Sequence, residues 1–334
     1  MNTSIMQRNS ITRRKFLRTI SVLSASPALL YQSSFSKGEG MPRIGYISGL
    51  HLETFFKKEL EILGFKNGES IHIEERLVPP NSLDWRTMAS ELAQIDLSLI
   101  VAGSLPFAFE IRKNNSKMPM VIVTCPGMVS NGFAESLEHP GGMYTGIDEL
   151  TPGVTAKRLQ LLKAAAPGIT HVALLSTAGS AGGHELQFTE ARKTAAMLGI
   201  DVKAYRASSS EQLEEGLEDL LNDAMNGMLL FEGGLALANR QLIVDVAMAN
   251  RLPAIYTQKA YVESGGLMAW APSLEQQFRE AAHYVEKILK GAKPGDLPIK
   301  HPEKYALTLN TGTAKMTGIQ FSKELYAEAS KIIQ

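Results

Sequence analysis

The sequence predicts an α/β protein of two doubly wound lobes. Short apolar runs alternate with amphipathic helical segments along most of the chain, and the alternation occurs in two successive series. Each series predicts a parallel sheet with helices on both faces. A length of 334 residues is enough for two units that each bury a core. The 44% hydrophobic and 20% charged residues, with a mean hydropathy of -0.05, are typical of a globular protein.

The first series is read from apolar runs that end at glycine or proline and from apolar residues that recur every three or four positions. Residues 43–48 form a short apolar run that ends at Gly49, which indicates a strand. The segment up to Gly64 then has a helical apolar face. In order, the predicted elements are a strand at 43–48, a helix at 52–63, strands at 71–75 and 97–102 on either side of a helix at 85–95, a short helix after Pro106, and a strand at 120–124.

The second series opens after Thr151-Pro152 and follows the same rules. Its first helix stops at Pro167, and each later strand is a short apolar run between helical segments. In order, the series predicts a helix at 154–165, a strand at 171–176, a helix at 185–198, a strand at 201–205, a helix at 211–221, a strand at 227–231, a helix at 235–250 and a strand at 254–256.

The tail is too short for a third lobe. It predicts a strand at 266–270, an amphipathic helix at 274–289, a Gly/Pro-rich segment at 291–298 and a strand at 305–309. These elements are expected to complete the two sheets, so the chain crosses between lobes more than once, near Thr151, Tyr256 and Lys293. We therefore expect a first lobe of residues 42–150 plus about 258–291 and a second lobe of residues 151–257 plus about 292–334.

The amino terminus has the pattern of an export signal. Residues 1–36 contain no acidic residue, and a basic segment precedes an apolar stretch at 20–30 that is too short to span a bilayer. Arg13-Arg14 followed by Lys-Phe-Leu predicts a twin-arginine signal peptide over residues 1–36, with a chance basic helix as the alternative. No cysteine stands just after the apolar stretch, as a lipid anchor of the usual kind requires. We expect a freely soluble periplasmic protein.

Charge and side-chain chemistry exclude several classes. The 34 basic and 34 acidic residues balance, and five of the basic ones lie in residues 1–36, so nothing favours nucleic acid or anionic lipid as a partner. Cys125 is the only cysteine, which excludes an intrachain disulfide and cysteine-based metal cages. The seven histidines lack metal-ligand spacing. The sequence therefore predicts no metal and no cofactor.

The carboxyl ends of the strands are where an open parallel sheet binds ligands. The loops there offer hydroxyls, small residues and backbone N–H groups, without a GxSxG elbow, an HExxH helix or a phosphate-binding glycine motif. They suit binding rather than catalysis. The candidate ligand-binding residues are Ser48, Gly49, Gly103, Ser104, Thr124, Cys125, Ser176, Thr177, Ser180, Glu232, Tyr256, Gln258 and Trp270.

Some of these candidates have a structural alternative. Ser104, Ser176 and Thr177 suit helix capping as well as ligand contact. Cys125 is favoured as a small buried hydrophobic residue over a nucleophile, since no histidine stands beside it in the sequence.

The charged and aromatic candidates also allow two interpretations. Glu232 is favoured to face a cleft rather than solvent, because it lies between an apolar strand end and two glycines. Tyr256, Trp270 and Phe107 suit either stacking on a planar ligand or packing in a core.

Eight sequence segments along the chain resemble, in the same order, segments of a known protein family. They are RIGYIS from Arg43, LEILGFKNGESIHIE from Leu60, LIVAGS from Leu99, AESLEHPGGMYTGI from Ala134, KRLQLLKAAAPGITHVALL from Lys157, NRLPAIY from Asn250, YVESGGLMAWAP from Tyr261 and YVEKILKGAKPGDLPI from Tyr284. From residue 42 to about 325 the chain thus resembles the ABC transporter substrate-binding family, which includes tryptophan- and tyrosine-binding receptors.

The resemblance implies a type I periplasmic-binding fold, with two Rossmann-like lobes joined by a three-strand hinge and a small molecule captured between them without catalysis. It also implies an ABC permease and an ATPase at the inner membrane as partners, and we expect a monomer. Carried over by position, the family's ligand loops fall on residues 48–49, 103–104 and 124–127 in the first lobe, and on 176–180, 232 and 256–259 in the second.

Departures from the family pattern concern the ligand. Where relatives commonly have an Asp in a DPVG-like turn, this chain has Gly127-Met128-Val129-Ser130, and where they often have Asn it has Ser176-Thr177. The carboxylate that amino-acid binders tend to place near residues 271–273 is also missing. Because a buried ammonium needs a paired acceptor, an amino-acid ligand is disfavoured, with Glu232 as the remaining acceptor.

Two other functions fit the same features. A periplasmic ligand sensor for a membrane signalling partner has the same sequence pattern. An exported enzyme on this scaffold, with Glu232 or Cys125 as its reactive group, is less favoured, although doubly wound folds support many chemistries.

Overall fold

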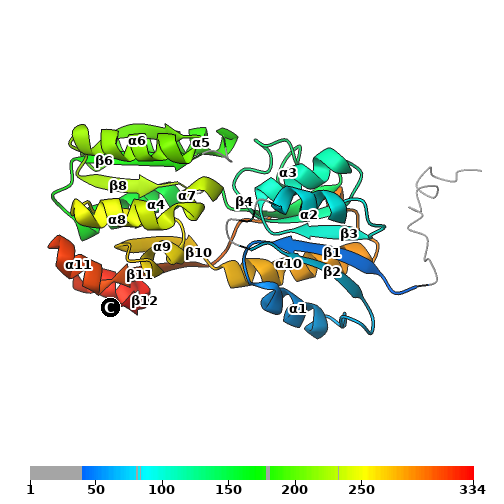
Figure 1. Ribbon diagram of the computed structural model, residues 1–334. Helices are drawn as coiled ribbons and strands as arrows, with labels where there is room; N and C mark the ends of the chain where they lie inside the picture. The colour runs from blue at the N-terminus through cyan, green and yellow to red at the C-terminus, as the bar shows by residue number, and fades with distance from the viewer. Residues whose placement is uncertain (1–39, 80–81, 83, 178–180, 232) are drawn as a thin grey trace, which may run out of the picture. The chain divides into compact units, whose positions relative to one another are not determined.

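The computed structural model describes residues 40–79, 82, 84–177, 181–231 and 233–334, without the side chains of residues 181–183. The predicted signal peptide lies outside the described residues. The described chain forms two β-sheets, each with helices on both faces (Figure 1). In this part of the chain, no helix is both long and apolar enough to cross a membrane.

The first sheet has strands that are buried along most of their length, because helices cover both faces. Its strands are β1 (Arg43–Ser48), β2 (His72–Leu77), β3 (Leu99–Ala102), β4 (Met120–Cys125) and β5 (Tyr144–Asp148). All neighbours are parallel, in the order β2-β1-β3-β4-β5. One face packs against α1 (Glu53–Ile62) and α10 (Leu274–Leu289), and the other against α2 (Trp85–Leu92) and α3 (Leu105–Asn114).

The second sheet contains seven strands in the order β12-β11-β10-β9-β8-β6-β7. Neighbours are parallel except β10 and β11, which are antiparallel. Its strands are β6 (His171–Thr177), β7 (Asp201–Ala207), β8 (Gly227–Leu230), β9 (Ala254–Tyr256), β10 (Met268–Pro272), β11 (Tyr305–Asn310) and β12 (Ala329–Ile333).

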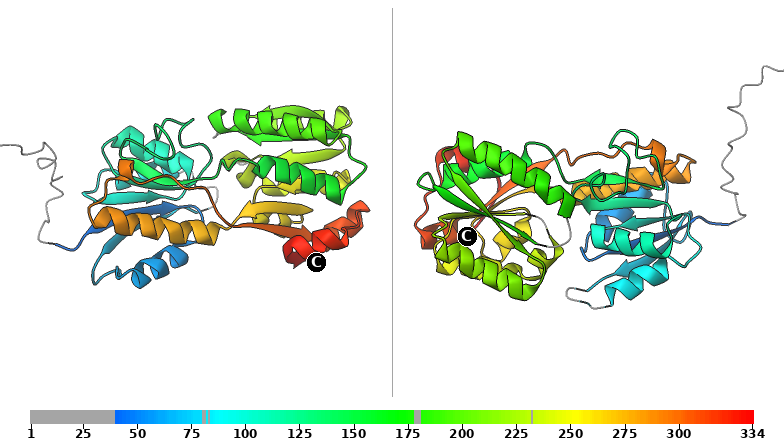
Figure 2. Two further views of the ribbon diagram at one scale, coloured as in Figure 1. Left: turned by 180° about the vertical axis from the view of Figure 1, so that it is seen from behind. Right: turned by 90° about the horizontal axis from the view of Figure 1, so that it is seen from above.

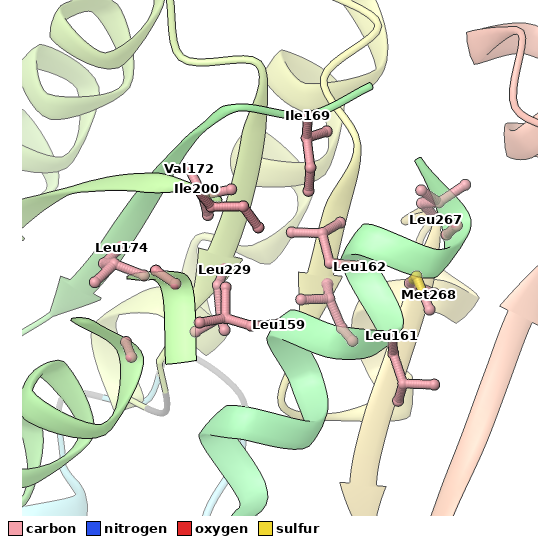
Figure 3. Packing of buried hydrophobic residues seen from close by; sticks show 14 of the residues in the cluster. Leu159, Leu161, Leu162, Ile169, Val172, Leu174, Ile200, Leu229, Leu267 and Met268 are labelled. Atoms are coloured by element: carbon pink, nitrogen blue, oxygen red, sulfur yellow. The ribbon is translucent and has the colours of Figure 1, made fainter. Parts of the chain in front are cut away.

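Helices cover both faces of the second sheet as well. One face packs against α4 (Val154–Ala165), α5 (Ala181–Met197), α11 (Thr311–Thr317) and α12 (Lys323–Glu328). The other packs against α6 (Ser210–Asn222), α7 (Gly234–Ala238), α8 (Arg240–Ala249) and α9 (Lys259–Glu263). Figure 3 shows Leu159 and Leu162 of α4 directed at Val172, Leu174 and Leu229 of the sheet. Each such buried leucine contributes about 2 kcal/mol of transfer free energy.

The chain passes between the two sheets three times. Residues 149–153 lead from β5 to α4, Ser273 separates β10 from α10, and residues 301–304 lead into β11. Between the second and third passages, α10 packs on the first sheet, as Figure 2 shows, and Thr145 Oγ1 donates to the Leu297 carbonyl at 2.8 Å. The α/β class with two lobes of mostly parallel strands, predicted from the sequence, is confirmed.

Two of the three passages lie elsewhere than predicted. The passage expected near Tyr256 is at Ser273, because β10 pairs with β9 and stays in the second sheet. The passage expected near Lys293 lies after Lys300, because the segment with the short 3₁₀ helix Pro294–Asp296 rests on the first lobe. Periodicity identifies a strand or helix but not the sheet that it joins. Residues 258–272 therefore lie in the second lobe and residues 292–300 in the first, opposite to the prediction.

Candidate ligand-binding site

The carboxyl ends of β1, β3 and β4 lie together at one edge of the first sheet. The Gly103 N–H donates to the Ile47 carbonyl at 2.8 Å, and Thr124 Oγ1 donates to the Gly103 carbonyl at 2.7 Å. A Cβ at position 103 would lie 2.7 Å from the Cβ and Oγ of Ser48, closer than real Cβ atoms approach. Glycine at 103 therefore lets the ends of β1 and β3 meet, and three predicted candidates form one continuous edge.

Thr124 adopts a strained backbone conformation at this edge. Its φ is 37°, which a β-branched residue rarely adopts, and it lies where the register between β4 and β5 shifts. Such strain costs about 1–3 kcal/mol and persists only where the surroundings impose it. The hydrogen bond to Gly103 is one such constraint. Strained residues concentrate at ligand-binding sites, so Thr124 keeps its place among the candidates.

The hydroxyl groups at the first-lobe edge differ in whether the protein already uses them for its own hydrogen bonds or leaves them free to contact a ligand. Ser48 is buried, and its Oγ both donates to the Leu50 carbonyl and accepts from the Leu50 N–H, each at 3.0 Å. Ser104 is half-buried at the N-cap of α3 and accepts no capping hydrogen bond. Gly49 is exposed. Ser104 is thus the hydroxyl at this edge that the fold leaves most available.

Cys125 lies in the core of the first lobe rather than on its surface. The side chain is fully buried in an apolar cluster that includes Met128 and Phe133 of the loop after β4. Burial, and to a lesser degree the nearby carboxylates of Asp148 and Glu149, raise the pKa of the Cys125 thiol well above its ordinary value. A neutral, inaccessible thiol is a poor nucleophile, which removes one basis for the enzyme alternative.

The second-lobe edge is built from the ends of β6, β8, β9 and β10. Ser176 and Thr177 are both buried, and Ser176 Oγ donates to the Tyr205 carbonyl at 3.4 Å. Thr177 Oγ1 accepts the Ala236 N–H at 3.2 Å, so it holds the first turn of α7 instead of capping the helix that follows it. A Cβ at Gly233 would lie 2.1 Å from Thr177 Oγ1. These two hydroxyls are structural; Ser180 and Glu232 lie outside the described residues.

Tyr256 and Gln258 are buried candidates. The Tyr256 ring stacks on Tyr261 with centroids 5.0 Å apart and an interplanar angle of 3°. Full burial raises the pKa of the Tyr256 phenol, and its hydroxyl has no hydrogen-bond partner among the described residues. Gln258 is the N-cap of α9 but makes no side-chain capping bond. Tyr256 therefore packs in the core, the second of the two interpretations that the sequence allows for it.

Trp270 is the aromatic candidate that remains partly exposed. Its ring stacks on Tyr305, with centroids 5.8 Å apart and an interplanar angle of 17°, and Lys157 Nζ lies 5.6 Å from its centroid. Its backbone carbonyl accepts a hydrogen bond from Arg158 Nε at 3.0 Å. Phe107, the third aromatic candidate, is buried and packs edge-on against Trp85.

Three buried polar residues near the strand ends are not among the residues predicted from the sequence. Asp148 is buried and accepts the backbone N–H groups of Gly127 and Met128 in the loop after β4, and that of Leu150 just after β5. Arg158 is a buried cation in the first turns of α4, and His184 is buried in α5 with its ring stacked on Phe231 at 5.9 Å. The only signal for Arg158 was a charge within a predicted apolar helix face; nothing in the sequence marks the other two.

The two edges supply hydroxyls, backbone groups and one half-buried indole. Among the described residues, no cluster of three or more His, Cys, Asp or Glu could hold a metal ion. The donor set suits reversible hydrogen bonding and stacking to a small polar molecule.

The family model for ABC transporter substrate binding protein matches residues 51–333. A curated relative, the tyrosine-binding protein of Clostridioides difficile (strain R20291), is 22% identical over 265 residues, which covers 79% of this chain and 76% of the relative. Among solved structures, an ABC domain in complex with L-Trp from Streptococcus pneumonia has a TM-score of 0.79 at 19% identity and covers 88% of this chain and 100% of that one.

A conserved domain protein from Vibrio cholerae has a TM-score of 0.77 at 18% identity, again covering 88% of this chain and 100% of that one. These structural likenesses confirm the type I periplasmic-binding fold implied by the resemblance in the sequence.

Proposed function

Because the chain belongs to the ABC transporter substrate-binding protein family, we propose that it captures a small molecule between its two lobes and delivers it to a membrane permease driven by an ATPase. The match to the family over residues 51–333 carries this proposal, and it assigns the chain to binding proteins rather than enzymes. Ligand contact with both lobes would favour a closed population, and the closed form would dock on the permease.

For the ligand we propose an amino acid with an aromatic side chain. The curated relative is named for tyrosine, and the similar solved structure holds L-Trp. The half-buried ring of Trp270 offers a stacking surface for such a side chain. This choice departs from the expectation, drawn from missing carboxylates in the sequence, that an amino acid is disfavoured.

Thermal stability with a panel of ligands tests the proposal. Purified protein is titrated with the twenty amino acids, and with sugars and nucleosides as other classes, and whatever copurifies is identified by mass spectrometry. A ligand at a hundredfold excess over its Kd should stabilise the fold by about 2.7 kcal/mol. L-tyrosine or L-tryptophan should give the largest shift and be recovered unaltered. A panel without any stabilising compound, or a ligand recovered in altered form, contradicts the proposal.

Variants at the first-lobe edge test the site. Thr124→Val removes the hydrogen bond to Gly103, and Ser104→Ala removes the available hydroxyl, so each should weaken binding by about tenfold, or 1.4 kcal/mol. Thr189→Val is the matched control, because the hydroxyl of Thr189 in α5 donates to the Glu185 carbonyl of the same helix at 2.9 Å. Calorimetric titration checks the three affinities, and equal affinities in all three variants would argue against this edge.

Uptake of the labelled ligand by cells that lack the protein separates an importer from a sensor. An importer predicts lost uptake, whereas a sensor predicts unchanged uptake and a lost signalling response.

We further propose export to the periplasm by the twin-arginine route, which the basic pair ahead of the apolar stretch supports. Replacing both Arg13 and Arg14 by Lys should hold the precursor in the cytoplasm, as fractionation of cells would show. Normal export of that variant would favour another route.

A further inference from the structure

The side chain of Asp148 fastens the loop that follows β4. Its Oδ1 accepts the Gly127 N–H at 2.8 Å, and its Oδ2 accepts the Met128 N–H at 2.7 Å. Gly127 has a φ of 85°, which lets two successive N–H groups face the same carboxylate. Hydrogen bonds to a charged acceptor are about twice as strong as neutral ones. The buried Asp148 carboxylate therefore anchors the start of the first-lobe loop, which is also stabilised by hydrogen bonds within the loop, such as that from Asn131 Nδ2 to the Gly127 carbonyl at 2.7 Å.

The same residue is fastened to two of the passages between the sheets. Oδ1 of Asp148 also accepts the Leu150 N–H at 2.8 Å, in the first passage. Its backbone N–H donates to the Lys300 carbonyl at 2.8 Å, and its carbonyl oxygen lies 2.7 Å from Nδ1 of His301, where the third passage begins. A shift of the loop after β4 must therefore either move Asp148, and with it the contacts at these passages, or break the hydrogen bonds from Gly127 and Met128 to its carboxylate.

The next residue links to the second passage. The Glu149 N–H donates to the Cys125 carbonyl at 2.9 Å, and Glu149 Oε1 accepts from Gln277 Nε2 at 2.7 Å. Gln277 is buried in α10, which begins directly after Ser273. The end of β5 is thus in hydrogen-bond contact with the ligand loop and with segments at all three passages.

We propose that Asp148 is a positioning residue that couples the first-lobe loop at residues 126–133 to the passages between the lobes. Through its carboxylate and backbone, a ligand that shifts or rigidifies this loop biases the hinge. The inference rests on the proposed function for its ligand, but the coupling itself is a property of the ligand-free protein and is measured there.

Hydrogen exchange followed by mass spectrometry on the full ligand-free chain tests the coupling. Asp148→Asn replaces one acceptor oxygen by an NH₂ group that cannot accept, and should raise exchange about tenfold in residues 126–133 and also in residues 301–304. The matched control is Asp223→Asn, which removes the charge of a carboxylate that accepts hydrogen bonds from Lys203 Nζ and Tyr205 Oη in the second lobe and so weakens both bonds. It should raise exchange only around those residues.

A second variant tests whether a change at the third passage affects the loop after β4, and it leaves the hydrogen bonds of that loop in place. His301→Ala removes the 2.7 Å contact with the Asp148 carbonyl and no contact with residues 126–133. Exchange of the Gly127 and Met128 amides should still rise about threefold, the effect of one modest hydrogen bond. Unchanged exchange of these two amides in this variant, or changes confined to 126–133 in Asp148→Asn, would overturn the coupling.

Titration with L-tyrosine and L-tryptophan then separates this inference from the proposed function. If wild type binds either ligand, Asp148→Asn should weaken binding by about tenfold and Asp223→Asn should leave it unchanged. Equal affinity of Asp148→Asn and wild type would contradict the link to ligand. If wild type binds neither, the ligand assignment fails, whereas the exchange experiments still decide the coupling.

Discussion

The packing around Gly103 leaves no room for a methyl group, so we expect Gly103→Ala to lower the free energy of unfolding. In Gly103→Ala the new Cβ would lie 2.7 Å from the Ser48 side chain and 3.0 Å from the Ile47 carbonyl. Overpacking of this kind costs about 1–3 kcal/mol of unfolding free energy, measurable by urea titration. The control is Gly216→Ala in α6, where a Cβ meets nothing within 4 Å and helix propensity should add about 0.5–1 kcal/mol. A neutral Gly103→Ala would mean that the ends of β1 and β3 separate readily.

The hydroxyl of Tyr256 provides a second prediction. Tyr256→Phe removes a fully buried hydroxyl without a partner among the described residues, so unfolding free energy should stay equal or rise by about 1 kcal/mol, and ligand affinity should not change. Tyr284→Phe is the contrast, because Tyr284 Oη donates to the Pro298 carbonyl at 2.5 Å and its loss should cost about 1 kcal/mol. Weakened binding by Tyr256→Phe would return that residue to the site.

Single residues show where inference from the sequence stops. The ends of β1, β3 and β4 meet at one edge, as the predicted parallel sheet requires, and the role of their loops in binding stays a prediction. The sequence does not predict which side chains at these strand ends face outward. Thr177 accepts a hydrogen bond from the Ala236 N–H and Tyr256 stacks on Tyr261, whereas the Ser104 hydroxyl accepts no capping hydrogen bond and stays available to a ligand. Orientation at a strand end depends on long-range packing, which the local pattern does not contain.

At the scale of elements, α10 is decisive for the first lobe. Its buried side includes Phe278, which lies 6.1 Å from the ring of Tyr46 in β1. Phe278→Ala should cost about 3–5 kcal/mol in urea unfolding, the usual effect of a large cavity in a core. Phe109→Ala, on the partly exposed side of α3, should cost only about 1 kcal/mol. Similar costs for the two variants would show that α10 contributes little to this core.

The same helix shows what hydrophobic periodicity can predict, namely the bounds of a helix, and what it cannot, namely the sheet on which the helix packs. Its predicted bounds, residues 274–289, are those of α10 in the structure, because sixteen residues with one apolar face and the Ser273 cap define a helix locally. The sheet beneath it was not predictable in this way, since α10 packs on α1 and on strands of the first sheet that all lie more than a hundred residues earlier in the chain. Contacts of that separation leave no local trace in one sequence.

At the scale of the whole molecule, neither lobe is a continuous segment. The first sheet ends at β5, but the face formed with α1 is completed by α10 and the residues up to Lys300. A fragment of residues 41–150 would expose an apolar face that normally contacts Phe278, Ala281 and Val285. We expect this fragment to aggregate or to lack a cooperative urea transition.

Joining residues 41–150 to residues 274–300 should restore an independently folding lobe. The two ends are close, because Glu149 and Gln277 are hydrogen-bonded at 2.7 Å, and a Gly/Ser linker of about eight residues spans roughly 15 Å. The fusion should be monomeric in sedimentation and unfold cooperatively, whereas the same fusion carrying Phe278→Ala should be markedly less stable. If residues 41–150 alone unfolded with the same midpoint as the fusion, the first lobe would not depend on the returning helix.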